Sequence, residues 1–291
     1  MISPVRYLFV LDAKAAPSPV KERLGQEFKD LDSGVEYDFY EAGDPADILR
    51  HVSLYCDLHP DLDTCFVSCG GAAITSAVAA GLMGAGEGKT LAVYDPSGTD
   101  MLARNYEGRD FGSIARLLAG EVTPIDMIRV NNTYAVGSCT FGMEDLSAGS
   151  GLLQSLSSLL RRSFRSIRIT ADGIPLDTGT ILFLALSNGR FTDTGLCLAP
   201  QASITDGKAD LCIVRNLSPG RLAKLMPQLS DGSFADDPSF VSDTVLRRVG
   251  SLGIESAKDL TLSLDGQPLT GKQFTVKVIP GAVRMRIPSD L

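Results

Sequence analysis

The sequence predicts an α/β domain built on a doubly wound parallel sheet, followed by a second domain that is mainly antiparallel β. Up to about residue 126, apolar strand-like runs alternate with helical patterns, which is typical of a parallel sheet covered by helices. Beyond that point, strand-like runs follow one another with little helix between them. The second half also contains three Asp-Gly pairs, and Asp-Gly favours hairpin turns between antiparallel strands.

In the first half, strands and helices can be assigned in order. The expected strands are Val5–Leu11, Val35–Tyr40, residues 63–69 and Thr90–Tyr94, and another opens at Ile125. The expected helices are Pro19–Leu31, Pro45–Leu58, an alanine-rich helix after residue 71, and Ser113–Ala119. Their apolar residues recur at helical spacing, as in Val20, Leu24 and Phe28.

The turn at Gly70 and Gly71 is the first candidate binding site. It joins a β-favouring run to the alanine-rich helix, and in a parallel sheet such a turn lies at the carboxyl end of the strand, where ligands bind. The N–H groups and dipole of the helix start would favour a phosphate there. A lone Gly-Gly pair is a weak motif, so an ordinary strand-to-helix connection is an equal alternative.

In the second half, most of the expected elements are strands. These are Thr133–Cys139, Ser166–Thr170, Thr180–Leu186, Ala209–Val214, Leu260–Leu264 and Phe274–Ile279. Hairpin turns are expected at Asp172, Asp206 and Asp265, each of which precedes a glycine. Two helices are expected, Ser147–Phe164 and Leu217–Leu229, the second interrupted by Pro227. The tail Ala282–Ile287 alternates apolar and polar residues, which predicts an edge strand added to either domain.

Composition excludes several classes of function. The 291 residues are 44% hydrophobic and 21% charged, with a net charge of −8. A broad nucleic-acid surface needs clustered positive charge, so nucleic acid is not an expected partner. The sequence predicts no transmembrane segment, because no run approaches about 18 apolar residues, and it shows no signal-peptide pattern.

The cysteines favour a cytoplasmic protein. Six are present and none forms a Cys-x-x-Cys pair: Cys56, Cys65, Cys69, Cys139, Cys197 and Cys212. Most lie in apolar runs, as buried free thiols do in a reducing compartment. With only two histidines, the chain has little from which to build a zinc site or a His-based triad.

Several motifs occur together in a characteristic order. Residues 70–74 read Gly-Gly-Ala-Ala-Ile, 96–100 Pro-Ser-Gly-Thr-Asp, 125–126 Ile-Asp, 187–189 Ser-Asn-Gly, 198–202 Leu-Ala-Pro-Gln-Ala, 205–211 Thr-Asp-Gly-Lys-Ala-Asp-Leu, and 264–267 Leu-Asp-Gly-Gln. This series resembles the diacylglycerol kinase catalytic family, the lipid kinases that include bacterial diacylglycerol kinases and the sphingosine kinases. The resemblance covers nearly the whole chain and is closest in the second half.

The resemblance implies a fold and an activity. It implies a Rossmann-like nucleotide-binding domain at 1–126, to which about 281–291 return, and a β-sandwich domain at 127–280. It further implies ATP and Mg²⁺ as cofactors, with phosphoryl transfer to a lipid hydroxyl. The expected partners are thus a nucleotide and a lipid, with peripheral membrane contact, and a homodimer. The net negative charge does not favour contact with anionic headgroups.

Site residues also follow from the resemblance. The nucleotide would contact Gly70, Gly71, Ala72, Gly98, Thr99 and Lys14. Asp265 would accept the proton of the lipid hydroxyl, and Asp206 and Asp210 match a segment that holds a structural metal in some members. The simpler interpretation is that these aspartates are turn residues and that Lys14 is a solvated surface charge.

Certain residues depart from the family pattern. Ala72 stands where the family has the aspartate of its Gly-rich loop, and it can neither bind a metal nor accept a proton. Ile74 replaces a threonine and Gln267 a glutamate, while Asp95 and Asp100 are candidates for the acidity that Ala72 lacks. Each lost transition-state interaction costs about 10²–10³ in rate. A non-catalytic pseudokinase that binds a nucleotide, lipid or protein partner is therefore the alternative to an active lipid kinase.

Overall fold

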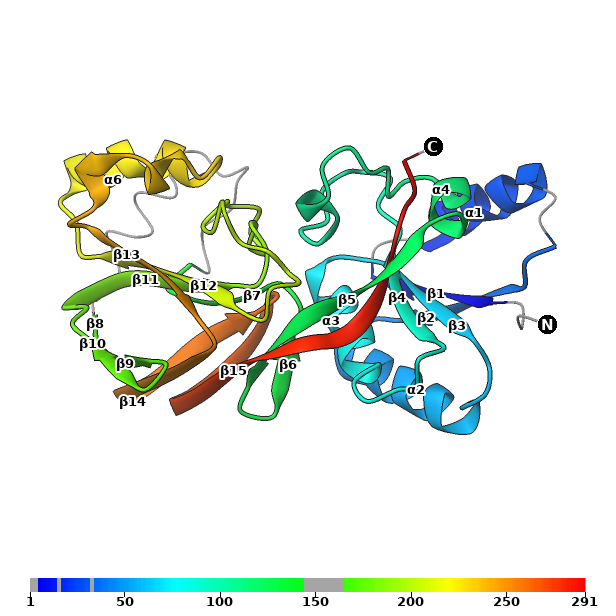
Figure 1. Cartoon of the computed structure of the whole chain (residues 1–291), viewed down its shortest axis with the longest axis horizontal. Helices are drawn as coiled ribbons and strands as arrows, with labels where there is room; N and C mark the ends of the chain where they lie inside the picture. Colours follow the sequence, from blue (N-terminus) through cyan, green and yellow to red (C-terminus); the bar gives the residue numbers. More distant parts are fainter. Residues whose placement is uncertain (1–4, 15–16, 32–33, 144–164, 291) are drawn as a thin grey trace. The chain divides into compact units, whose positions relative to one another are not determined.

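A computed structural model describes residues 5–14, 17–31, 34–143 and 165–290 of the chain (Figure 1). Two compact units are present. Unit 1 comprises Met1–Ile125 and Gly281–Leu291, and unit 2 comprises Asp126–Pro280. Strands β5 (Glu121–Val130) and β15 (Gln267–Ile287) each contribute residues to both units. The helix expected at Ser147–Phe164 lies outside the described residues.

Unit 1 contains the parallel sheet that the alternating pattern predicts. Its strands are β1 (Arg6–Asp12), β2 (Tyr37–Ala42), β3 (Thr64–Cys69) and β4 (Lys89–Val93), in the order β2-β1-β3-β4. All three neighbouring pairs are parallel. The end of β15 joins beside β4, where Met285 pairs with Leu91. The tail is therefore a strand of unit 1, with its apolar residues buried.

Helices cover both faces of this sheet. Figure 1 shows α1 (Pro17–Leu31) and α4 (Ile114–Leu118) on one face, and α2 (Pro45–Leu58) and α3 (Ala72–Gly81) on the other. A short 3₁₀ helix, η1 (Ala103–Asn105), precedes α4. The expected apolar side of α1 is buried at Leu24 and Phe28. Helices α2 and α3 pack closely at Gly81. A Cβ at this position would lie only 2.7 Å from the Cβ of Val52, so the close approach depends on glycine.

Unit 2 is mainly antiparallel β. Its principal strands are β7 (Ser138–Phe141), β11 (Thr180–Ser187), β12 (Ala209–Arg215), β13 (Thr244–Val249), β14 (Ser251–Leu264) and the first part of β15. They neighbour one another in the order β13-β12-β11-β7-β14-β15. Shorter strands are β6 (Thr133–Ala135), β8 (Arg165–Ser166), β9 (Arg168–Ala171) and β10 (Ile174–Leu176).

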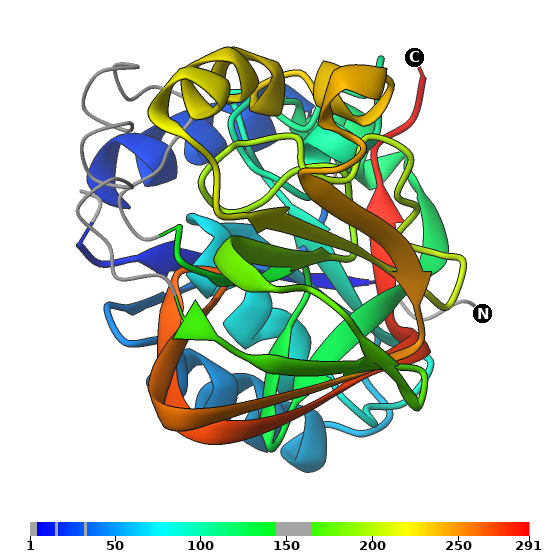
Figure 2. The same ribbon diagram turned by 90° about the vertical axis from the view of Figure 1, so that its left-hand side faces the viewer.

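Apolar side chains of unit 2 form two clusters. One lies among the strands and includes Ile169, Leu186 and Leu262. The other joins β11 and β12 to the helical segment, which Figure 2 shows in yellow and gold on one side of these strands. That segment consists of α6 (Pro219–Leu225), η2 (Met226–Leu229), η3 (Ser233–Ala235) and η4 (Pro238–Phe240). The helix expected at Leu217–Leu229 is interrupted as predicted: α6 ends at Leu225, and a 3₁₀ helix that contains Pro227 follows.

Several sequence expectations for unit 2 need correction. Thr133–Cys139 is not one strand, because Val136 and Gly137 separate β6 from β7 and turn their N–H groups toward the Asp265 carboxylate. Asp206 does not begin a hairpin, because no named strand lies between β11, which ends at Ser187, and β12, which begins at Ala209. The N–H of Gly207 donates to the Asp126 carboxylate at 2.6 Å. The other two hairpins are confirmed. Asp172 and Asp265 both have φ 48°, each followed by a glycine with positive φ, as a two-residue hairpin turn requires.

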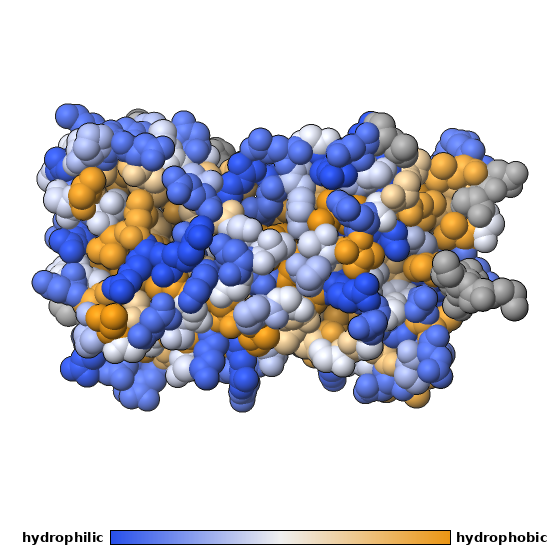
Figure 3. Space-filling model, viewed as in Figure 1, coloured by the Kyte–Doolittle hydropathy of each residue, from blue (hydrophilic) through white to orange (hydrophobic). Residues whose placement is uncertain are grey.

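None of the described helices has both the length and the apolar character needed to cross a membrane. Figure 3 shows hydrophilic residues over much of the face in view, with smaller apolar areas between them. Exposed large apolar side chains include Leu54 and Leu58 of α2, and Val241 and Leu246 of unit 2.

Candidate functional site

The carboxyl ends of β1, β3 and β4 form one edge of the unit 1 sheet, because these three parallel strands are neighbours. The loops that follow them contain all six residues expected to bind a nucleotide. Lys14 follows β1, residues 70–72 follow β3, and Gly98 and Thr99 follow β4. Ligands bind at this edge in open α/β sheets, so the structure collects these residues where a ligand site is expected.

The turn after β3 has the strand–glycine–helix form. Gly71 is the N-cap residue of α3, and no side chain of the described residues caps this helix start. A Cβ at Gly70 would lie 2.7 Å from Ile74, so the isoleucine side chain covers the space above this glycine. Gly71 itself is exposed with nothing near its missing Cβ. The first N–H groups of α3 therefore lie beside the exposed backbone of Gly71, and an anion can bind to N–H groups at such a helix start.

The loop after β4 folds around the carboxylate of Asp95. Its Oδ1 accepts hydrogen bonds from the N–H groups of Ser97 and Gly98, both at 3.1 Å. Its Oδ2 accepts from the N–H of Asp100 at 2.7 Å. Gly98 has φ 69°, a left-handed conformation that favours glycine. The side chains of Ser97 and Thr99 are 2.7 Å apart on the exposed side of this loop.

Asp100 links this loop to α3. Its Oδ1 accepts from the N–H groups of Leu102 and Ala103, at 2.8 and 3.1 Å. Thr75 of α3 places its hydroxyl 3.5 Å from Asp100 Oδ2 and 2.9 Å from the Ser68 hydroxyl. Asp100 is only 8% exposed. Burial raises the pKa of its carboxyl to about 6, with a smaller contribution from the charge of Asp95.

This carboxylate pair suits Mg²⁺ carried by a nucleotide. Magnesium in such sites is held by one or two carboxylates, and phosphate oxygens and water complete its shell. The contact of Asp100 Oδ2 with the Thr75 hydroxyl is long, at 3.5 Å, and burial raises the pKa of this carboxyl, so its negative charge is poorly stabilised. The described residues contain no group of three or more His, Cys, Asp or Glu side chains that could hold a metal. The donor set therefore fits a metal shared with phosphates.

Lys14 is exposed on the loop after β1. Its N–H donates to Asp12 Oδ1 at 2.8 Å, and its aliphatic chain lies over Gly43, where a Cβ would be 3.2 Å from Cε. Asp12 therefore acts as a turn residue in this loop. The Lys14 ammonium belongs to the same edge of the sheet as Gly71 and Asp95.

In unit 2, Asp265 is buried and fully engaged. Its Oδ2 accepts from the N–H groups of Val136 and Gly137, at 2.8 and 3.0 Å. Its Oδ1 accepts from the N–H of Ser138 at 2.6 Å, with the Ser138 hydroxyl at 3.5 Å. The side chain is 1% exposed. The carboxylate thus holds the connection between β6 and β7, which leaves its oxygens little capacity to accept a further proton donor.

Other motif residues join the same network. The amide of Asn188 donates to the carbonyls of Asp126 and Val136, at 2.8 and 2.9 Å. Asp126 in turn binds the N–H of Gly207. Motifs from four separate segments therefore meet in one buried hydrogen-bond network of unit 2. Their common role there is to hold backbone turns in place.

Asp206 and Asp210 lie together beside an arginine. Arg248 is 3.4 Å from Asp206 and 3.9 Å from Asp210. Burial raises the pKa of the Asp210 carboxyl, while the charge of Arg248 acts in the opposite direction. The guanidinium supplies positive charge next to both carboxylates. The structural metal at this pair stays a prediction.

Sequence reasoning missed Asp193, which lies next to the Asp265 turn. Its Oδ2 is 3.7 Å from the position that a Cβ on Gly266 would occupy. Its Oδ1 is buried and has no hydrogen-bond partner among the described residues. Burial raises the pKa of the Asp193 carboxyl, although N–H groups of residues 193–194 and the Ser263 hydroxyl act against this. No local motif marks this residue, because its neighbours come from β14 and its turn.

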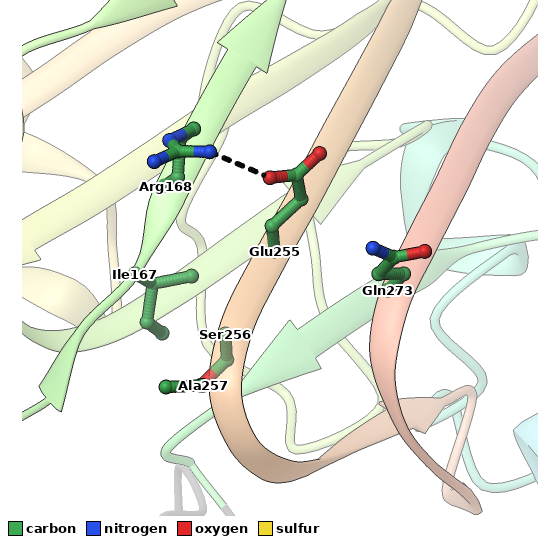
Figure 4. Close-up of a pocket in the computed structure, with 6 residues that line it drawn as sticks. All are labelled: Ile167, Arg168, Glu255, Ser256, Ala257 and Gln273. Atoms are coloured by element: carbon green, nitrogen blue, oxygen red, sulfur yellow. Dashed lines mark hydrogen bonds and ion pairs between the residues drawn. The ribbon is translucent and has the colours of Figure 1, made fainter.

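A separate surface pocket of about 520 Å³ in unit 2 involves none of these residues. It lies beside strands β9, β14 and β15 (Figure 4) and is lined by Ile167, Arg168, Glu255, Ser256, Ala257 and Gln273. Arg168 donates to Glu255 at 3.0 Å across it. The pocket therefore adds nothing to the predicted site.

Comparison with known proteins gives one family and several named relatives. Residues 130–287 match the family described as the YegS C-terminal NAD kinase beta sandwich-like domain. The "Probable lipid kinase YegS-like" of Pectobacterium atrosepticum is 28% identical over 186 residues, covering 59% of both chains. The "Probable lipid kinase YegS" of Salmonella gallinarum is 30% identical over 191 residues, covering 60% of both. The chain thus spans about 60% of the length of the curated relatives it matches.

Solved structures show the fold of the whole chain. A diacylglycerol kinase from Bacillus anthracis str. Sterne has a TM-score of 0.70 at 14% identity, covering 99% of this chain and 98% of its own. Another Bacillus anthracis chain has a TM-score of 0.77 at 16% identity, covering 99% of both. The predicted fold class, α/β plus mainly antiparallel β, is confirmed. The family match over more than half of the residues leads to the conclusion that the chain belongs to the YegS family, a branch of the diacylglycerol kinase family that its motifs resemble.

Proposed function

We propose that this protein binds ATP with Mg²⁺ at the carboxyl edge of the unit 1 sheet and transfers the γ-phosphoryl group to a lipid hydroxyl. The observation that carries the proposal is the meeting of two loops at that edge. One is the open glycine turn at the start of α3, and the other is the Asp95–Asp100 loop. They are linked through Thr75. Relatives named as lipid kinases support the choice of acceptor.

Each part of this edge has a distinct role. The first N–H groups of α3 bind phosphate oxygens, and the helix dipole favours their charge. Asp95 and Asp100 would hold the metal, which neutralises phosphate charge when it is bound. Lys14 is an exposed positive charge at the same edge, and Thr99 offers a hydroxyl. A lipid acceptor resides in a membrane, so we propose that the protein contacts the membrane peripherally.

Nucleotide binding is tested first by isothermal titration of the full chain with ATP, with and without Mg²⁺. We expect saturable micromolar binding that needs the metal. Asp95→Asn should weaken Mg·ATP binding at least about tenfold, since a charge-assisted contact contributes about 1.5–3 kcal/mol. Asp231→Asn, on an exposed turn of unit 2, is the matched control and should bind as the wild type does. Absence of heat at millimolar Mg·ATP would contradict the proposal.

A non-catalytic nucleotide-binding protein is the second candidate. Ala72 favours it, because this first residue of α3 brings no carboxylate to the glycine turn. The double variant Ala72→Asp, Ala73→Gly restores the aspartate and the glycine of the family pattern and leaves Ile74 in place. If the protein is an impaired kinase, transfer to a diacylglycerol should rise by about 10²–10³, whereas Ala72→Asn with the same glycine should have no such effect. Transfer that stays at background in a folded double variant would favour the non-catalytic candidate.

A further inference from the structure

The carboxylate of Glu27 on α1 joins two segments of unit 1 that are distant from it in sequence. Its Oε1 accepts a hydrogen bond from the Tyr94 hydroxyl at 2.9 Å. Its Oε2 accepts from the N–H of Ile114, the first residue of α4, at 3.1 Å. Arg23, one turn earlier on α1, donates to the same Oε1 at 3.0 Å. Glu27 therefore connects the residue that follows β4 with the start of α4.

Tyr94 leads directly into the loop of the two carboxylates. It is 3% exposed, and its N–H donates to the carbonyl of Ser68 in β3 at 2.9 Å. The next N–H, that of Asp95, donates to the carbonyl of Phe111 at 2.9 Å. Burial, and then the hydrogen bond to Glu27, raise the pKa of the Tyr94 hydroxyl, so this group stays protonated and remains a donor. Backbone and side chain thus both fix the residue from which the loop begins.

The segment before α4 packs against the same loop. A Cβ at Gly112 would lie only 2.9 Å from the Cα of Pro96, so this close approach depends on glycine. The carbonyl of Gly112 accepts from the Arg23 guanidinium at 3.4 Å, and this guanidinium lies 5.9 Å from the centre of the Tyr94 ring. The segment is therefore tied to α1 on one side and lies against the loop on the other.

We propose that Glu27 is a positioning residue, which holds residues 95–100 in the geometry that receives Mg²⁺ together with ATP. This inference rests on the proposed nucleotide binding. The Glu27 carboxylate is occupied by its own donors, so it acts through Tyr94 and Ile114 rather than by contact with the metal. Groups that orient metal ligands through hydrogen bonds contribute to metal affinity, and their loss typically lowers it about 10–100-fold.

The test titrates the full chain with Mg²⁺ at a fixed ATP concentration, follows ATP binding by calorimetry and measures Tm. Glu27→Ala should raise the Mg²⁺ concentration that gives half-maximal binding about 10–100-fold, and excess Mg²⁺ should restore binding by mass action. Tyr94→Phe removes only the hydroxyl and should raise this midpoint about tenfold. The double variant should add little to Glu27→Ala, because both changes remove the same contact.

Two further variants complete the set. Glu27→Gln keeps an oxygen for the Ile114 N–H and an NH₂ group that can donate to the Tyr94 hydroxyl, so its midpoint should lie between those of the wild type and Glu27→Ala. Glu22→Ala, at an exposed position on the same helix, is the matched control. Its midpoint should equal that of the wild type.

Each result has a definite meaning. A lower Tm of Glu27→Ala with an unchanged Mg²⁺ midpoint would overturn the inference, because the contact would then serve stability alone. Fully additive effects of Glu27→Ala and Tyr94→Phe would also overturn it, since Glu27 would not act through Tyr94. If Glu27→Ala does not fold, a wild-type midpoint in Tyr94→Phe has the same consequence. A wild type that binds no ATP at millimolar Mg²⁺ would overturn the proposed function, and this inference with it.

Discussion

Replacing Asp265 with alanine should lower the free energy of unfolding by about 3–5 kcal/mol, because three buried N–H groups lose their acceptor and each unsatisfied group costs about 1–3 kcal/mol. The donors are Val136, Gly137 and Ser138, and burial to 1% exposure keeps bulk water from replacing the carboxylate. Alanine would also be strained at φ 48°. We expect thermal unfolding to show a fall in Tm of about 10 °C.

Asp265→Asn separates backbone strain from hydrogen bonding. Asparagine tolerates positive φ, yet its amide has one acceptor oxygen and its NH₂ group would face an N–H donor. The expected order of stability is wild type, then Asn, then Ala. Asp231→Ala, on an exposed turn of the same unit, should have a much smaller effect. If Asp265→Asn abolished phosphoryl transfer but kept the wild-type Tm, Asp265 would be a catalytic base rather than the structural residue that its contacts indicate.

Replacing Asp100 with asparagine should stabilise the protein at pH 8. The pKa of Asp100 is about 6 in the folded protein, raised from 3.8 chiefly by burial. The folded state therefore holds the proton more tightly than the unfolded state, and stability is lost as pH rises from about 4 to about 6. About two pKa units correspond to about 3 kcal/mol, which is the upper limit of the gain. Asparagine keeps an oxygen for the N–H groups of Leu102 and Ala103.

Urea unfolding at pH 4, 5, 6 and 8 measures this effect. The gain in the free energy of unfolding of Asp100→Asn over the wild type should be absent at pH 4, grow through pH 6 and then stay constant. Asp231→Asn is the control of opposite sign. The Ser233 N–H lowers the pKa of the Asp231 carboxyl, so loss of this carboxylate should lower the free energy of unfolding above pH 4. Asp100→Asn should also weaken the dependence of ATP binding on Mg²⁺. A variant no more stable than wild type at pH 8 would show that Asp100 is well stabilised as an anion.

Local pattern was sufficient to predict much of the fold. The run before Gly70 is a buried strand and the alanine-rich stretch after it is α3, because periodicity and two glycines specify both elements. Pro45 begins α2 as expected, with Asp44 capping the N–H of Ala46. Asp172 forms a hairpin because its neighbours are themselves strands. Asp206 does not, because no strand leads into it, and its turn is instead held by Asp126, a residue distant in sequence that accepts from the Gly207 N–H.

The candidate site was predicted less completely than the fold. The glycine turn and the loop after β4 were identified from their order after parallel strands, and both lie on the expected edge. Asp193 was not identified, because no spacing in its own segment relates it to Ser263 or Gly266. The sequence also could not show that three backbone N–H groups occupy Asp265, since their donors are in the β6–β7 connection.

By itself, the amino-acid sequence determined the fold class, the order of the strands and α-helices of unit 1, and the family. Hydrophobic periodicity, turn residues and motif order can be read from the sequence without knowledge of the tertiary contacts. Only the tertiary structure decided which carboxylates are saturated and which are not. Asp265, Asp193 and Asp100 are the same residue type, yet they differ in burial and in N–H partners from other segments. Those partners set the energy of a charged oxygen, and folding alone brings them together.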